Sequence, residues 1–103
     1  MKVEVLHIAG CPSWQEAGAQ TRRALDVLGM RDVDVNYRLI ASAADAEATR
    51  FAGSPTILID GQDAFASTER VTALSCRLYP TPDGLRDSPT LGQIIEAIRA
   101  RRL

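Results

Sequence analysis

Apolar side chains recur with two different periods along the chain, and the shorter period predicts strands. Residues 3–8 form a β-branched and apolar run closed by a glycine, which is typical of a central strand covered on both faces. Residues 32–40 alternate apolar and polar positions, and this pattern predicts a half-buried strand. Two further strands are expected over residues 55–59 and 74–79.

Glycine, proline and aspartate mark the ends of the later strands. Residues 60–63 predict a tight turn or the start of a loop. Residues 80–84 contain two prolines and a glycine, so the strand over residues 74–79 is not expected to continue through them. The aspartates of these segments are expected to be solvated turn residues: Asp60, Asp63, Asp83 and Asp87.

A period of 3.6 residues predicts three helices, the first of which follows Cys11-Pro12. Ser13 and Glu16 match a capping box, in which each side chain bonds to the backbone of the other residue. Apolar positions then recur at helical spacing as far as Leu28, and Gly29 is placed to supply a left-handed cap.

The other two helices have similar start signals. Ser42 is expected to cap a helix with a shallow apolar stripe that ends at Gly53. Ser88 is the expected cap of the last helix, Pro89 occupies its first turn, and its apolar face runs to Arg101. The predicted order is strand, helix, strand, helix, strand, strand, helix.

Length and charge limit the function classes. The 103 residues, 46% of them hydrophobic, suit a single domain over residues 1–103. Twelve basic and thirteen acidic residues give a net charge of -1, which argues against charge-driven binding to nucleic acid or to a membrane surface. No export signal is visible at the start, so the expected compartment is the cytoplasm, where both cysteines should rest as thiols.

Two motifs resemble those of the thioredoxin-like superfamily. Cys11-Pro12-Ser13-Trp14 lies where the first strand meets the first helix, which is where that superfamily carries its Cys-x-x-Cys motif. Gly53-Ser54-Pro55-Thr56 is similar to the segment that leads into the family's third strand, with a cis peptide bond before the proline. The resemblance implies an α/β fold of the thioredoxin-like type, with a mixed sheet of about four strands.

The same resemblance implies roles for individual residues. Cys11 takes the position of the attacking thiol, whereas Trp14 stands where the family has its resolving cysteine. A redox reaction would then use one thiol, with release of the mixed disulfide by glutathione as co-substrate or by Cys76. The residues implied in holding the partner are Pro12, Trp14, Ser54, Pro55 and Thr56.

The positions of the two cysteines predict different environments. The start of a helix stabilises a thiolate by about 0.3 to 1 kcal/mol when exposed, which favours a reactive Cys11 over an inert, packed one. Alternation places Cys76 on the same face as Leu74 and Leu78, so it is expected to point into the core. With about 10 Å between strands two places apart, a bridge from Cys11 to Cys76 would need loop movement, because disulfides need Cα atoms within about 7 Å.

Aromatic side chains near Cys11 have structural alternatives. Trp14 either shields the thiol and offers a surface to a substrate, or anchors the core and covers the helix end. His7 could stabilise a thiolate, although a hydrogen-bonded structural histidine is the favoured interpretation.

Three functions therefore remain open. The first is a thiol-disulfide oxidoreductase in which the Cys11 thiolate attacks disulfides or oxidised thiols of a protein or of glutathione. The second is a non-catalytic interaction module, for which Trp14 is the best support. The third is a protein that binds a soft metal or organomercury through Cys11 and Cys76, although no residue pattern predicts a resident metal or cofactor.

Overall fold

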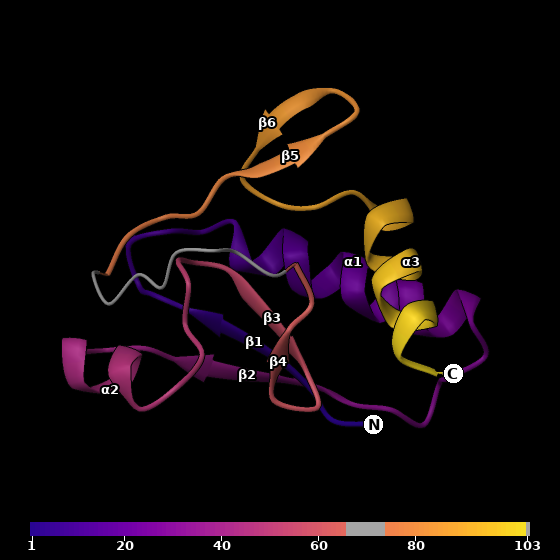
Figure 1. Cartoon of the computed structure of the whole chain (residues 1–103), viewed down its shortest axis with the longest axis horizontal. Coiled ribbons are helices and arrows are strands. Elements are labelled where there is room, and N and C mark those ends of the chain that lie inside the picture. The colour runs from indigo at the N-terminus through magenta and orange to yellow at the C-terminus, as the bar shows by residue number, and fades with distance from the viewer. Residues whose placement is uncertain (66–73, 103) are drawn as a thin grey trace.

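A four-stranded mixed sheet forms the centre of the computed structural model, which describes residues 1–65 and 74–102 (Figure 1). Strand β1 (Val3–His7) pairs in parallel with β2 (Val35–Leu39) and antiparallel with β3 (Thr56–Ile59). Strand β4 (Gln62–Asp63) pairs antiparallel with β3, which gives the order β2-β1-β3-β4. The sequence prediction that residues 3–8 form a central strand is confirmed.

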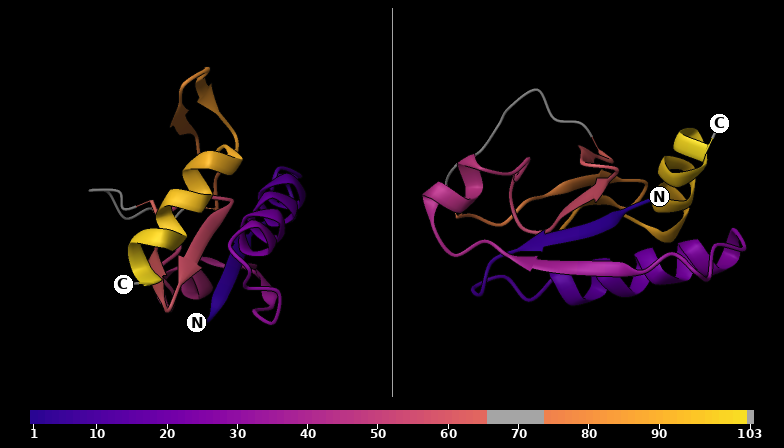
Figure 2. Two further views of the ribbon diagram at one scale, coloured as in Figure 1. Left: turned by 90° about the vertical axis from the view of Figure 1, so that its right-hand side faces the viewer. Right: turned by 90° about the horizontal axis from the view of Figure 1, so that it is seen from below.

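Alternating side chains of β1 build two apolar clusters, one on each face of the sheet. On one face, helices α1 (Trp14–Val27) and α3 (Leu91–Arg102) pack side by side against β1 and β3 (Figure 2). The buried residues of this cluster are Val3, Ala17, Ala24, Leu25, Ile57, Ile59, Ile94 and Ile98. The second cluster involves α2 (Ala43–Glu47) and contains Leu6, Ile8, Cys11, Ile40, Ala46, Phe51 and Leu58.

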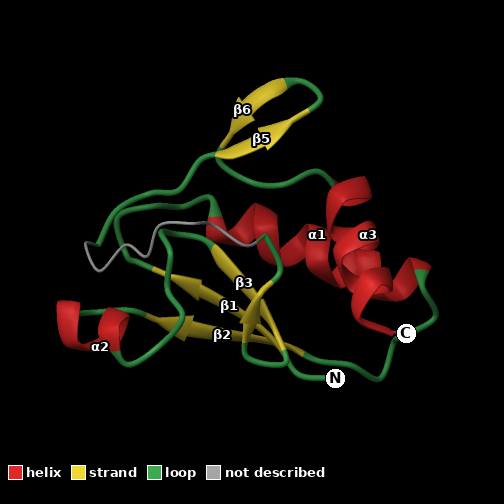
Figure 3. Ribbon diagram, in the orientation of Figure 1, coloured by secondary structure: helices red, strands yellow, loops and turns green. Residues whose placement is uncertain are grey.

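The prediction of a strand over residues 74–79 is wrong. A separate hairpin of β5 (Tyr79–Thr81) and β6 (Gly84–Arg86) forms instead, and it stands apart from the main sheet (Figure 3). Pro80 lies inside β5, opposite Leu85, although the prolines were expected to exclude a strand. A two-stranded hairpin has two free edges, so a residue without an N–H can be accommodated there.

The predicted cap positions are confirmed for α1 and α2 and corrected for α3. The Ser42 hydroxyl accepts from the Asp45 N–H, although α2 ends well before the predicted limit at Gly53. Ser13 has helical dihedral angles and no side-chain capping bond, because the chain already turns at that residue. For α3 the cap is Thr90 rather than Ser88. The Thr90 hydroxyl accepts from the Gln93 N–H, and the Gln93 side chain accepts from the Thr90 N–H.

Gly18 allows α1 to approach the exposed edge strand β2. A Cβ at this position would lie 2.8 Å from Cζ of Tyr37 and closer still to other atoms of that side chain. Tyr37 is 49% exposed, so its ring can turn outward, but it would lose its contact with Trp14.

We expect Gly18→Ala to lower the free energy of unfolding by about 1 kcal/mol, because the overpacking cost exceeds the gain in helix propensity. Denaturant unfolding followed by tryptophan fluorescence measures both the stability and the displaced ring. Gly92→Ala in α3 is the matched control, because the nearest atom to its added Cβ is 4.0 Å away. The free energy of unfolding of this control variant should rise by about 0.5 to 1 kcal/mol. Equal gains in the two variants would contradict the proposed close approach.

Candidate functional site

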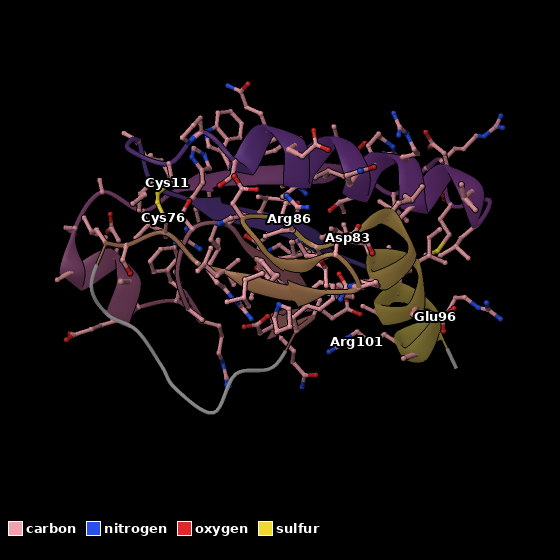
Figure 4. The ribbon with its side chains drawn as sticks, turned by 90° about the horizontal axis from the view of Figure 1, so that it is seen from above. Cys11, Cys76, Asp83, Arg86, Glu96 and Arg101 are labelled. Carbon is pink, nitrogen blue, oxygen red and sulfur yellow. A yellow bond between two sulfur atoms is a disulfide. The ribbon has the colours of Figure 1, made fainter. Side chains whose placement is uncertain are left out.

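A disulfide joins Cys11 to Cys76, 65 residues later in the chain (Figure 4). The two Cα atoms are 6.0 Å apart. The expectation that both cysteines rest as thiols is therefore wrong for this form of the protein. The predicted separation of about 10 Å also fails, because that value placed Cys76 in a strand two places along the sheet. Cys76 instead lies in an extended segment that passes the end of the sheet beside Ser54.

Ser54 binds the backbone on both sides of Cys76. Its N–H donates to the Ser75 carbonyl over 2.8 Å, and its carbonyl accepts from the Arg77 N–H over 2.9 Å. The Ser54 hydroxyl accepts from the Ile8 N–H over 3.1 Å, which ties this turn to the end of β1. One buried serine thus holds the chain near Cys11 and the chain around Cys76 together.

The turn before β3 is closed by its own hydrogen bonds. The Ser54–Pro55 peptide bond is cis, as the resemblance implies. The Thr56 hydroxyl donates to the Gly53 carbonyl, and the phenol of Tyr79 donates to the Pro55 carbonyl. Ser54, Pro55 and Thr56 are all buried, so in this form they are not exposed to a partner.

Exposure of the two cysteines is the reverse of what the sequence predicts. Cys11 is 2% exposed and belongs to the apolar cluster around Phe51. Cys76, predicted to enter the core, is exposed. The prediction failed because strict alternation places side chains only within a paired strand, and Cys76 forms a single isolated bridge. An incoming group therefore meets the Cys76 half of the disulfide first.

The environment of Cys11 would act on its thiol in two opposite ways after reduction. Cys11 precedes Ser13, the cap residue of α1, and the positive end of that helix favours a thiolate. Burial among apolar side chains favours the neutral thiol. Pro12, which follows Cys11, is exposed at the same edge.

Trp14 and His7 form a stack on the α1 side of the sheet. Their ring centroids are 4.3 Å apart with an interplanar angle of 20°, and Tyr37 meets Trp14 edge-on. His7 Nδ1 is buried without a hydrogen-bond partner among the described residues, so the expected hydrogen-bonded histidine is not found at that atom. Burial lowers the pKa of His7, opposed to a smaller extent by the Ile8 backbone. Trp14 is thus a half-buried member of an aromatic stack at the start of α1, and its contact with a substrate stays a prediction.

Sequence reasoning missed a cluster around Arg77. We call Asp63, Phe65, Arg77 and Tyr79 the Arg77 cluster. Asp63 was expected to be a solvated turn residue, but its carboxylate lies 2.8 Å from the Arg77 guanidinium, and the two side chains are only 14% and 10% exposed. Gly53 packs against Arg77 with a φ of 108°, and a Cβ on it would lie 2.7 Å from Cβ of Arg77, but no local pattern in the sequence indicates the cluster.

An apolar groove of about 400 Å³ lies beside the loop that leads from β1 to Cys11. It is lined by Ile8, Ala9, Gly10, Leu39, Ile40, Ala41 and Leu74. Within residues 1–65 and 74–102, no group of three or more histidine, cysteine or acidic side chains could hold a metal ion. In the same residues, no helix has the length and apolar character that crossing a membrane requires.

Comparisons of the chain with protein-family models, with curated proteins and with solved structures find no match.

Proposed function

We propose that this protein is a thiol-disulfide oxidoreductase with a thioredoxin-like fold, and that Cys11 and Cys76 are its redox pair. The observation that carries the proposal is the asymmetry of the disulfide. Cys11 is buried in the apolar cluster around Phe51, whereas Cys76 is exposed on a segment held by the Ser54 backbone. A disulfide in which one cysteine is exposed and held in a fixed position can be attacked by the thiol of a partner.

The arrangement of the elements supports the thioredoxin-like part of the proposal. Cys11 lies between β1 and α1, and the helix returns to a parallel β2 at the edge of the sheet. Strand β3 then pairs antiparallel with β1, directly after the Ser54–Pro55 turn. The resemblance drawn from the sequence implies this same order and these two positions.

Exchange at the proposed site changes the order of attack that the resemblance implies. In the reduced protein, the exposed Cys76 thiolate attacks one sulfur of a partner disulfide and releases the other partner sulfur as a thiolate. The Cys11 thiolate then attacks Sγ of Cys76, which forms the Cys11–Cys76 bond and releases the second partner sulfur. Two protein thiols are oxidised, and one partner disulfide is reduced to two thiols. A dithiol, or two glutathione molecules, returns the protein to its reduced form by the reverse steps.

In this order of attack the resolving cysteine is Cys11 rather than a residue at position 14. Trp14 fills the place of the family's second cysteine, so the second sulfur of the redox pair comes from Cys76, 65 residues from Cys11. The soft-metal alternative needs both sulfurs as thiolates, so it applies only to the reduced protein.

The test is catalysis of the reduction of a peptide disulfide by dithiothreitol. We expect the wild-type protein to accelerate this reduction, and both Cys11→Ser and Cys76→Ser to lose at least about tenfold of the acceleration, since each lacks one of the two exchange steps. Arg38→Ala, on the exposed strand β2, is a control that should keep full activity. Wild-type protein no faster than the uncatalysed reaction would exclude the oxidoreductase proposal and favour the interaction module.

A further inference from the structure

The segment that carries Cys76 is anchored by contacts that do not involve sulfur. We propose that Arg77 is a positioning residue that holds Cys76 opposite Cys11 in both redox states of the protein. This inference rests on the proposed function, because it explains how the second exchange step can follow the first without a search through solution.

The Arg77 side chain makes three contacts within the Arg77 cluster. Nη1 lies 2.8 Å from Oδ2 of Asp63, in a pair of which both members are largely buried. Nη2 donates to the Phe65 carbonyl. The guanidinium carbon lies 4.5 Å from the centre of the Tyr79 ring. The planar guanidinium binds two oxygens and stacks on a ring at the same time, so its orientation is fixed. A lysine ammonium, which acts as a point charge, would restrict the position of the backbone much less.

None of these contacts involves either sulfur of the disulfide. Asp63 is in β4 at the edge of the main sheet, and Phe65 follows it. Tyr79 is in β5, and its phenol donates to the Pro55 carbonyl. Burial raises the pKa of Tyr79, so the phenol keeps the proton that this bond requires. The cluster therefore connects the Pro55 turn, β4 and the hairpin by contacts in which the disulfide takes no part.

The backbone of Arg77 is held as closely as its side chain. Its N–H donates to the Ser54 carbonyl, and the Ser54 N–H reaches the Ser75 carbonyl on the other side of Cys76. A Cβ on Gly53 would lie only 2.7 Å from Cβ of Arg77, so the two segments are in direct contact. The residues on both sides of Cys76 are thus hydrogen-bonded to Ser54, and Arg77 is also held by its side chain. We call these contacts of Ser54 and Arg77 the clamp.

If the clamp persists after reduction, it keeps the Cys76 thiol close to the Cys11 thiol and so raises their effective concentration. Two thiols held in place have a far higher effective concentration than two thiols joined by a flexible loop. Loss of the clamp would leave Cys76 on a chain free to leave Cys11. The equilibrium between the reduced and oxidised protein should then shift toward the dithiol.

The experiment measures this equilibrium in glutathione redox buffers, where the reduced protein and one oxidised glutathione yield the disulfide and two reduced glutathiones. Thiol-specific labelling and mass spectrometry give the ratio of the two forms and hence the effective concentration. We expect Arg77→Ala to lower it by about tenfold or more, because the substitution breaks a buried, hydrogen-bonded ion pair. Arg77→Lys, which keeps the charge and loses the fork, should lower it by less.

Arg86→Ala is the matched control, since Arg86 is an exposed arginine on the hairpin that follows Arg77 (Figure 4). It should leave the effective concentration unchanged within about twofold. Thermal unfolding of both redox forms separates positioning from general stability. A merely structural Arg77 would destabilise both forms equally and leave the equilibrium unmoved, and that result would overturn the inference. Asp63→Asn provides a second variant with an expected decrease should Arg77→Ala fail to fold.

The two proposals fail in different ways. If the wild-type protein does not catalyse exchange but Arg77→Ala lowers the effective concentration, the proposed function is wrong and the positioning role of Arg77 stands. If the wild-type protein catalyses exchange and the Arg77 variants keep the wild-type equilibrium, only the positioning role is wrong.

Discussion

Cys76→Ser is expected to lower the free energy of unfolding by about 4 kcal/mol under oxidising conditions. The disulfide closes a loop between residues 65 positions apart, and a cross-link of this span removes about 4 kcal/mol of chain entropy from the unfolded state. Cys76 is exposed, so the serine itself should add little packing cost. Folded domains of this size are stable by only about 5 to 15 kcal/mol, so the loss is a large fraction of the total.

Thermal and denaturant unfolding, with and without dithiothreitol, measure this contribution. At about 4 to 8 °C for each kcal/mol, the midpoint of thermal unfolding should fall by roughly 20 °C. The reduced wild-type protein should show nearly the same loss, whereas dithiothreitol should not change Cys76→Ser further. A variant as stable as the oxidised wild-type protein would mean that the cross-link does not constrain the unfolded chain.

The link between folding and disulfide formation also limits how easily the disulfide is reduced. Because folding and disulfide formation are linked, whatever the disulfide adds to the stability of the fold, the fold adds to the stability of the disulfide. A strongly stabilising cross-link is a poor oxidant of other thiols. We therefore expect the protein to work as a reductant of partner disulfides, supplied with electrons by a strong dithiol.

Local patterns predicted the inner sheet of this protein well. The apolar run of residues 3–8 and the run of residues 55–59 became β1 and β3, because strands buried on both faces leave a continuous hydrophobic signal. The left-handed residue at Gly29 also followed from its place after the last apolar position of α1. In each case the residues that determine the local structure are neighbours in the sequence.

The candidate site was only half visible in the sequence, because its second half depends on contacts between distant segments. Cys11 and the Ser54–Pro55 turn could be found from motifs, but the pairing of Ser54 with residues 75 and 77 leaves no periodic pattern. Alternation around Cys76 resembled a core strand and predicted the wrong face. Asp63 likewise has the composition of a turn, and only the approach of Arg77 from 14 residues away makes it half of an ion pair.

The reduced cysteines should differ strongly in reactivity, with Cys76 the faster. In Cys11→Ser the remaining Cys76 is exposed, and an alkylating reagent or a partner disulfide reaches it directly. In Cys76→Ser the remaining Cys11 is 2% exposed within an apolar cluster, so it reacts only when the structure opens locally. We expect alkylation of Cys11 to be about tenfold to a hundredfold slower than that of Cys76 at neutral pH.

Rates of iodoacetamide labelling, measured by mass spectrometry on the two single-cysteine variants, test this difference. Labelling in denaturant is the control, because both thiols should then react at similar rates. A glutathione mixed disulfide should accumulate on Cys76 in Cys11→Ser treated with oxidised glutathione, since no second thiol can displace it. Faster labelling of Cys11 would assign the first attack to that residue, as the family resemblance implies. In that case the segment around Cys76 must leave Ser54 when the disulfide is reduced, and the clamp at Arg77 could not hold in both states.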